Sequence, residues 1–193
     1  MNAKLRLPPD SALLLIDVVN PFDFPGAGRL LRRATPAAAR IAALKQRASR
    51  ARVPAIYVND NYGDWHAEFA ELIERFASRE ARGRRLVEQL RPRPSDFHVL
   101  KPLHSGFHST SLAVLLERID ARCLVLTGVA AHICVLFTAI DAYMRGLEIV
   151  VPSDCVASES ARQEQYALQQ MADVLRARIV PSSGMRFSRR PGG

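Results

Sequence analysis

A short apolar run at residues 123–127 most constrains what this chain can fold into. The run, Cys-Leu-Val-Leu-Thr, lacks the polar alternation of a half-exposed strand, so it predicts a strand buried on both faces. Gly128 is expected to end that strand. Over residues 131–144 the apolar positions then lie nearly all round a helical repeat, and Gly146 offers a left-handed stop. A buried strand joined directly to a buried helix is typical of α/β proteins.

The same alternation extends along the chain. The expected strands are residues 12–17, 53–59, 97–100, 123–127, 148–151 and 178–180. The expected helices are residues 35–51, 64–78, 79–90, 111–117, 131–144 and 159–175, the first with Thr35 as its cap and Pro36 as its first residue. This order predicts a three-layer α/β/α fold with a mostly parallel sheet and right-handed crossovers. We expect one domain over residues 1–193, with a core at about 10–181 and a basic tail at 185–193.

Composition excludes several classes of protein. With 48% hydrophobic and 24% charged residues in a chain of 193, disorder is not expected. No apolar run has the length of a membrane span, and the N-terminal residues lack a secretory signal. The three cysteines have neither zinc-site nor disulfide-framework spacing, so we expect a reduced, cytoplasmic setting.

The net charge of +8 raises the alternative of a nucleic-acid binder. The arginines are scattered over several expected helix faces, and no nucleic-acid motif accompanies them. We therefore expect a solvated basic surface, with no nucleic-acid or membrane partner. A salt-dependent retention assay would separate the two interpretations.

Cys134 lies at the start of the buried helix, just past the carboxyl end of the strand at 123–127. Free backbone N–H groups and the helix dipole favour a thiolate at such a place, which makes Cys134 a candidate nucleophile. The alternative is a cysteine that only packs, which on position alone is the commoner case.

Two further reactive residues follow expected strands. Asp17 ends the run 12–17, although it could equally cap the loop that follows. Lys101 follows the run 97–100, and it is one of only three lysines in a chain whose surface charge is arginine. The carboxyl ends of parallel strands meet at one edge of a sheet, where ligands bind. Asp17, Lys101 and Cys134 are therefore expected to converge there.

With these residues in view, the chain resembles the isochorismatase-like cysteine hydrolases, which include nicotinamidases, N-carbamoylsarcosine amidohydrolases and isochorismatases. The matching pieces are Leu-Leu-Leu-Ile-Asp17 with Asn20, Ile-Tyr-Val-Asn59-Asp60, Lys101 with Ser105-Gly106-Phe107 and Thr110, Leu-Thr-Gly128-Val129-Ala130-Ala131-His132-Ile133-Cys134-Val135, and Val-Pro-Ser-Asp154-Cys155. The resemblance spans about residues 10–181. It implies a six-stranded sheet of order 3-2-1-4-5-6, an Asp17–Lys101–Cys134 triad and a cis peptide bond between Val129 and Ala130. It also implies a homo-oligomer, either a dimer or a tetramer.

These residues predict hydrolysis of a C–N bond in a small amide or ureido substrate. Asp17 would accept the thiol proton of Cys134. Lys101 would stabilise both the Asp17 carboxylate and the Cys134 thiolate. By resemblance, the N–H groups of Ala130 and Cys134 would hold the oxyanion. Candidate substrate contacts, chosen for their loop positions, are Phe22, Asn59, Trp65 and His132, although His132 could equally be a satisfied first-turn residue. The alternative function is a non-catalytic binding or scaffold protein on the same fold.

No metal and no cofactor are expected. Nicotinamidases in this group carry an Asp-x-His metal motif after the second strand, whereas this chain has Asp60-Asn61-Tyr62 there. His66 comes later and is expected to be a surface residue. The segment Gly26-Ala27-Gly28 does not make a dinucleotide fingerprint, because Leu31 occupies the third glycine position.

Overall fold

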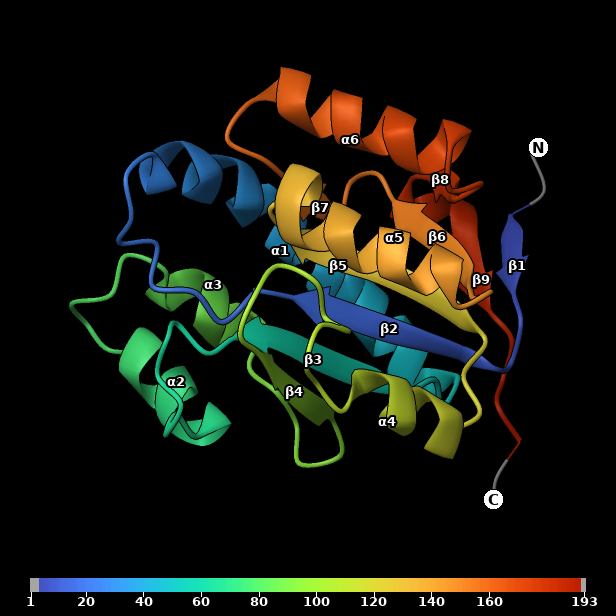
Figure 1. Ribbon diagram of the computed structural model, residues 1–193, viewed down its shortest axis with the longest axis horizontal. Helices are drawn as coiled ribbons and strands as arrows, with labels where there is room; N and C mark the ends of the chain where they lie inside the picture. Colours follow the sequence, from blue (N-terminus) through green and yellow to red (C-terminus); the bar gives the residue numbers. More distant parts are fainter. Residues whose placement is uncertain (1–3, 192–193) are drawn as a thin grey trace.

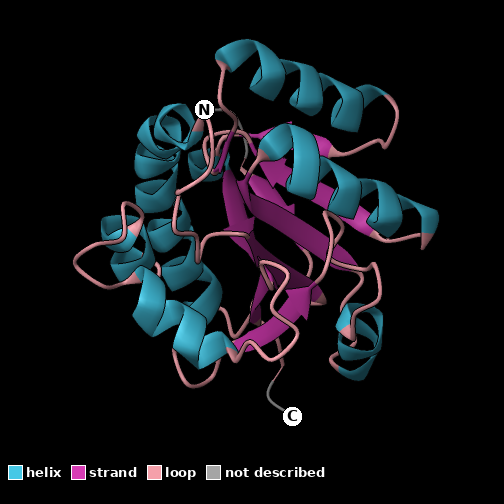
Figure 2. Ribbon diagram, turned by 60° about the vertical axis from the view of Figure 1, so that its left-hand side comes forward, coloured by secondary structure: helices cyan, strands magenta, loops and turns pink. Residues whose placement is uncertain are grey.

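A parallel sheet between two layers of helices forms the centre of the computed structural model, which describes residues 4–191 (Figures 1 and 2). The strands are β1 (Leu5–Leu7), β2 (Ser11–Ile16), β3 (Ala55–Asp60), β4 (Phe97–Lys101), β5 (Cys123–Val129), β6 (Glu148–Pro152), β7 (Val156–Ala157), β8 (Arg178–Val180) and β9 (Met185–Phe187). The main sheet has the order β4-β3-β2-β5-β6-β8, with β7 paired to β5. This matches the expected order of the six predicted strands, and the three-layer α/β/α prediction is confirmed.

The helices divide between the two faces of the sheet. They are α1 (Ala27–Arg50), α2 (Phe69–Phe76), α3 (Arg84–Gln89), α4 (Leu112–Arg118), α5 (Leu136–Met144) and α6 (Ala161–Asp173). In β2, Leu13 and Leu15 pack with α1, α2 and α3, whereas Leu14 and Ile16 pack with α4, α5 and α6. Alternate side chains of each strand enter opposite cores. The unbroken apolar runs of the sequence follow from this double burial.

Gly128 does not end β5, which continues to Val129. A Cβ atom at Gly128 would lie 2.0 Å from the carbonyl oxygen of Ile16, and its φ is +112°. Glycine is therefore required because β2 passes too close for any side chain. The glycine that was interpreted as a stop instead permits the pairing of the two central strands.

The first long helix begins at Ala27, eight residues before the predicted cap Thr35. Thr35 Oγ1 donates to the carbonyl oxygen of Leu31 at 2.8 Å, so it caps nothing, and Pro36 lies inside the helix. Leu30 and Ala34 are buried and extend the apolar stripe of α1 upstream. Their packing outweighs the hydrogen bond lost at Pro36.

The two helices predicted at 64–78 and 79–90 are shorter, at Phe69–Phe76 and Arg84–Gln89. Asp64 Oδ1 accepts the N–H of His66 at 3.0 Å, a local bond that favours a turn over a helix. Gly83 packs against the loop after β2, where a Cβ atom would lie 2.0 Å from the carbonyl oxygen of Asn20. This contact delays α3 until Arg84.

The segment predicted as a tail, 185–193, contributes a strand. Met185–Phe187 forms β9 and pairs in parallel with β1. Leu7, Met185 and Phe187 are all buried in the core on the α1 side, so the core reaches beyond 10–181 at both ends. The tail prediction is therefore wrong for residues 185–187. Residues 192–193 lie outside the described range.

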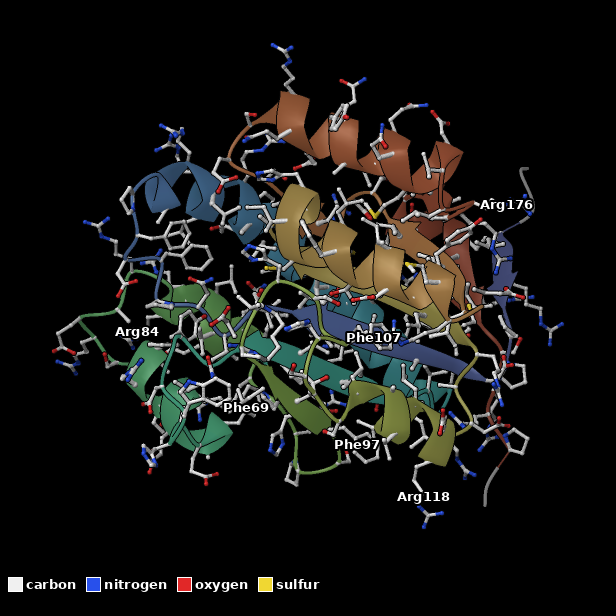
Figure 3. All side chains as sticks on the ribbon, viewed as in Figure 1. Phe69, Arg84, Phe97, Phe107, Arg118 and Arg176 are labelled. Carbon is white, nitrogen blue, oxygen red and sulfur yellow. The ribbon has the colours of Figure 1, made fainter. Side chains whose placement is uncertain are left out.

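The basic charge is carried largely by arginines at the surface. Arg118 and Arg176 extend into solvent (Figure 3). The residues that the structure describes include no helix with both the length and the apolar character to cross a membrane.

Candidate active site

Four neighbouring strands bring polar or reactive residues to the carboxyl edge of the sheet. Asp17 follows β2, Asp60 ends β3, Lys101 ends β4, and Cys134 follows β5. Between β2 and β5 the chain changes the side of the sheet to which it adds strands. Such a switch point is where open α/β sheets bind ligands.

Lys101 connects the other three residues. Its Nζ lies 2.9 Å from Asp17 Oδ2, 3.5 Å from Asp60 Oδ2 and 3.7 Å from Cys134 Sγ. Lys101 pairs with Asp60 in the register of β3 and β4, so its stem must pass the end of β3 to reach Asp17. The side chain is 0% exposed. A slender lysine stem fits this path, whereas a planar guanidinium is wider.

Asp17 is held from two sides. Its φ is +50°, which turns the chain out of β2, and its N–H donates to the carbonyl oxygen of Val58 at 3.0 Å. Its Oδ1 accepts the N–H of Asp60 at 2.7 Å, while Oδ2 faces Lys101. The carboxylate is therefore fixed by the backbone of β3 as well as by the ammonium group.

Cys134 lies in a single π-helical turn, Ala131–Val135, that leads into α5. The bond between Val129 and Ala130 is cis, as the resemblance implied. Thr138 Oγ1 donates to the carbonyl oxygen of Cys134 at 2.7 Å, and it accepts the N–H of Gly106 at 3.0 Å. The loop after β4 therefore braces the turn that carries the thiol.

Burial dominates the titration of this cluster. It raises the pKa of Asp17 above its ordinary value, against the lowering effects of Lys101 and Cys134. Burial, together with the Asp17 charge, also raises the pKa of the Cys134 thiol well above its ordinary value, and Lys101 offsets this only in part. The pKa of Lys101 is lowered by burial but raised more by Asp17, Cys134 and Asp60, so it stays above its ordinary value. Burial thus works against the thiolate that the position of Cys134 favours, and Lys101 is the group that works in its favour.

A cavity of about 300 Å³ opens over the thiol. Its walls come from the ends of four strands and the loops that follow them, from the loop after β7, from the first turn of α1 and from the π-helical turn that precedes α5. They are formed by Asp17, Asn20, Phe24, Leu30, Asp60, Tyr62, His104, Val129, Ala130, Ile133, Cys134 and Glu159. Both Asp17 and Cys134 thus face a space that holds a small molecule, with Lys101 in contact behind them.

The four predicted substrate contacts lie outside this wall. Phe22 is fully buried in the core, and Trp65 is 78% exposed. Asn59 is also buried: its side chain accepts the N–H of Val19 and donates to the carbonyl oxygen of Val19, both at 3.0 Å. His132 turns toward Ser158 instead, with Nδ1 at 2.9 Å from its Oγ.

Several residues that were not predicted as substrate contacts line the cavity instead. Asp60 ends β3, Tyr62 follows it, and Glu159 follows β7, so each could have been found from its position at or just after the end of a strand. Burial raises the pKa of Tyr62 well above its ordinary value, and its hydroxyl donates to the carbonyl oxygen of Val19 at 2.7 Å. Phe24 could not have been distinguished from Phe22, because only the fold decides which ring faces the cavity.

The residues near Asp60 do not fit a metal site. Asp60 is engaged by Lys101 and by the N–H of Tyr62, and His66 is exposed. Within residues 4–191, no group of three or more His, Cys, Asp or Glu side chains is arranged to hold a metal ion.

Comparison with known proteins agrees with the fold. Residues 11–180 match the family model described as the isochorismatase domain. The chain is 38% identical over 171 residues to the isochorismatase family protein YaaI of Bacillus subtilis, covering 89% of this chain and 93% of that protein. It is 33% identical over 111 residues to the ureidoacrylate amidohydrolase RutB of Methylorubrum extorquens, which covers 52% of this chain but only 45% of RutB.

A solved structure supports the same assignment. The N-carbamoylsarcosine amidase of Thermoplasma acidophilum is 27% identical, has a TM-score of 0.69 and is matched over 89% of this chain and 96% of its own. The chain therefore belongs to the isochorismatase family of hydrolases.

Proposed function

We propose that this protein is a cysteine hydrolase that cleaves a C–N bond in a small amide or ureido substrate, with Asp17, Lys101 and Cys134 as its catalytic triad and without a metal. One observation carries the proposal: Lys101 Nζ lies within 3.7 Å of both the Asp17 carboxylate and the Cys134 thiol, below a cavity. The named activities of RutB and of the N-carbamoylsarcosine amidase support an amide or ureido group as the bond that is cleaved.

The first step is a proton transfer coupled to attack. Asp17 accepts the proton of the Cys134 thiol while the sulfur attacks the substrate carbonyl carbon. The raised pKa of Asp17 makes it a stronger base than an ordinary carboxylate. The transfer exchanges a carboxylate for a thiolate beside the same ammonium group. The buried net charge stays constant, so a high thiol pKa in the free protein does not prevent the step.

The later steps reuse the same groups. The backbone N–H groups of Ala130 and Cys134 hold the oxyanion of the tetrahedral intermediate. Asp17 returns its proton to the leaving nitrogen, the C–N bond breaks, and ammonia or an amine departs from a thioester or thiocarbamate. Water, deprotonated by Asp17, then attacks the acyl carbon. The C–S bond breaks, the thiol recovers its proton, and an acid or carbamate is released.

The test is a panel of small amides, ureido compounds and carbamates, assayed for ammonia or amine release. We expect at least one to be turned over and to give a covalent adduct on Cys134 by intact-protein mass spectrometry after acid quench. Cys134→Ala should abolish turnover and the adduct while the circular dichroism spectrum and thermal midpoint stay close to wild type. A Cys134→Ala protein that retains near-wild-type turnover would end the proposal.

The homo-oligomeric state implied by the resemblance stays a prediction, as does the cytoplasmic setting. Size-exclusion chromatography with light scattering tests the first.

A further inference from the structure

One carboxylate that the proposed chemistry does not use, Glu159, lines the cavity above Cys134. Its Oε2 atom is buried and accepts no hydrogen bond from any residue in the described range 4–191. Burying a carboxylate oxygen without a donor is costly. Glu159 therefore brings to the cavity wall a carboxylate whose Oε2 atom has no hydrogen-bond donor from residues 4–191.

The nearest side chain that could neutralise Glu159 is His132, whose Nε2 lies 3.5 Å from Glu159 Oε2. Ser160 Oγ donates to Gln163 Oε1 at 2.7 Å, which directs the amide nitrogen of Gln163 at His132 Nε2, 3.3 Å away. That nitrogen of His132 therefore accepts, and the ring proton lies on Nδ1, facing Ser158 Oγ at 2.9 Å. The imidazole in this arrangement has no proton to donate to Glu159.

The cavity carries more negative than positive charge. Asp17, Asp60 and Glu159 all line it, and none of the lining residues is lysine or arginine. Lys101 lies against Asp17 and Asp60, and within residues 4–191 no lysine or arginine pairs with Glu159. This is the reverse of the whole chain, whose net charge is +8. A negative site in a basic protein discriminates by charge between small ligands.

Apolar side chains also form part of the cavity wall. Phe24, Leu30, Val129 and Ile133 line the same space as Glu159 and Cys134. A ligand with an amide at the thiol therefore meets an apolar wall as well as the carboxylate.

We infer that Glu159 is a specificity residue that selects amides carrying a positively charged nitrogen, joined to the scissile group by a short apolar spacer. The inference rests on the proposed function for its scissile group, and it adds the substrate class. The cationic nitrogen pairs with the Glu159 carboxylate, and the same negative charge disfavours substrates that end in a carboxylate.

Binding tests this inference without turnover. Calorimetry with the Cys134→Ala protein at pH 8 compares 5-aminopentanamide with its neutral isostere hexanamide and with glutaramate. We expect the cationic amide to bind roughly 10- to 100-fold more tightly than the neutral one, as for a hydrogen bond to a charged group, and glutaramate to bind most weakly. Equal affinity for the first two amides would overturn the inference.

The residue is tested by Glu159→Gln in the same background, because glutamine keeps the shape and loses the charge. The cationic preference should fall to about threefold or less, that is, most of the charged hydrogen bond should be lost. Glu148→Gln removes the same charge from the exposed start of β6 and should leave the preference unchanged. An unchanged preference in Glu159→Gln would also overturn the inference.

Kinetics then separates the inference from the proposed function. In the protein with Cys134 intact, Glu159→Gln should lower kcat/KM for 5-aminopentanamide by a larger factor than kcat/KM for hexanamide. If 5-aminopentanamide binds through Glu159 but no amide is cleaved, the proposed function fails and the inference stands. If amides are cleaved without any charge preference, the inference fails and the proposed function stands.

Discussion

Within residues 4–191, two buried lysine–aspartate pairs lie at opposite ends of the sheet. At the carboxyl end, Lys101 contacts Asp17 at 2.9 Å with side chains 0% and 7% exposed. At the amino end, Lys45 of α1 contacts Asp96 at 2.5 Å, with both side chains 8% exposed. By distance and burial alone the two pairs look alike.

Their surroundings differ. Lys101 faces two carboxylates and a thiol, which together hold its pKa above the ordinary value. Burial lowers the pKa of Lys45, and Asp96 offsets this only in part. Lys45 Nζ also donates to the Tyr57 hydroxyl at 2.7 Å, which in turn bonds the carbonyl oxygen of Leu90. The amino-end pair thus joins α1, β3 and the end of α3. The comparison teaches that a nucleophile and a cavity beside a buried pair, not the pair itself, point to chemistry.

The largest expected effect is at the carboxyl end. Lys101→Arg should lower kcat/KM on a confirmed substrate by roughly 100-fold or more, the scale of losing a preorganised charge. The planar guanidinium does not fit a slot in which the side chain is 0% exposed. Steady-state kinetics measures the loss, with circular dichroism as the control for folding. Activity within tenfold of wild type would place Lys101 outside the catalytic unit.

The matched change at the amino end should act on stability. Lys45→Met leaves Asp96 buried without its partner, which should lower the free energy of unfolding by about 3 kcal/mol. Urea denaturation measures this, and kcat should stay within about twofold because Lys45 lies at the opposite edge from Cys134. The double variant Lys45→Met/Asp96→Asn should recover part of the loss. A large fall in kcat, with the free energy of unfolding unchanged, would show that Lys45 contributes to catalysis and not to stability.

The pH dependence should also distinguish the two ends. Asp17 must be ionised to accept the thiol proton, so kcat/KM should fall as pH falls through its pKa. Because burial raises that pKa, the acid limb should lie above the ordinary aspartate value of about 3.9. Lys45→Met should leave the limb in place. An acid limb at or below the ordinary value would contradict the role of Asp17 as base.

Thiol labelling gives a smaller effect. The raised pKa of Cys134 predicts that iodoacetamide modifies it more slowly at pH 7 than it modifies a free thiol, which has a pKa of about 8.5. Quantifying the Cys134 peptide by mass spectrometry measures the rate. Cys134→Ala identifies that peptide and corrects for the buried Cys123 and Cys155. Modification faster than that of a free thiol would show a resting thiolate instead.

The smallest effect should come from chelators. Prolonged dialysis against EDTA should leave the rate unchanged, because Asp60 is bound to Lys101 and Tyr62 and is not free to coordinate a metal. Metal analysis of the dialysed protein is the control. A stoichiometric metal bound through Asp60 and His66, with loss of rate on its removal, would contradict the prediction that the activity is independent of a metal.

Much of the site could be predicted because parallel strands end at one edge. Asp17, Lys101 and Cys134 each directly follow or end a strand that was visible as an apolar run, so their convergence follows from topology alone. The residues chosen from loops fared differently. Phe22 and Tyr62 have positive φ values of 53° and 55°. Neither residue type favours that backbone conformation, so the sequence does not indicate it. One ring enters the core, and the other lines the cavity.

The sequence by itself determined the alternation of strands and helices, because the period of apolar residues is a local property. It also determined that Asp17, Lys101 and Cys134 lie toward the carboxyl ends of neighbouring strands. Only the tertiary structure decided what local patterns cannot encode. Gly128 continues β5 because Ile16 of β2 lies against it. The helix α1 passes through Pro36 because Leu30 and Ala34, upstream of it, are buried in the core. Burial raises the pKa of Cys134, and the desolvation of a thiol depends on every element packed around it.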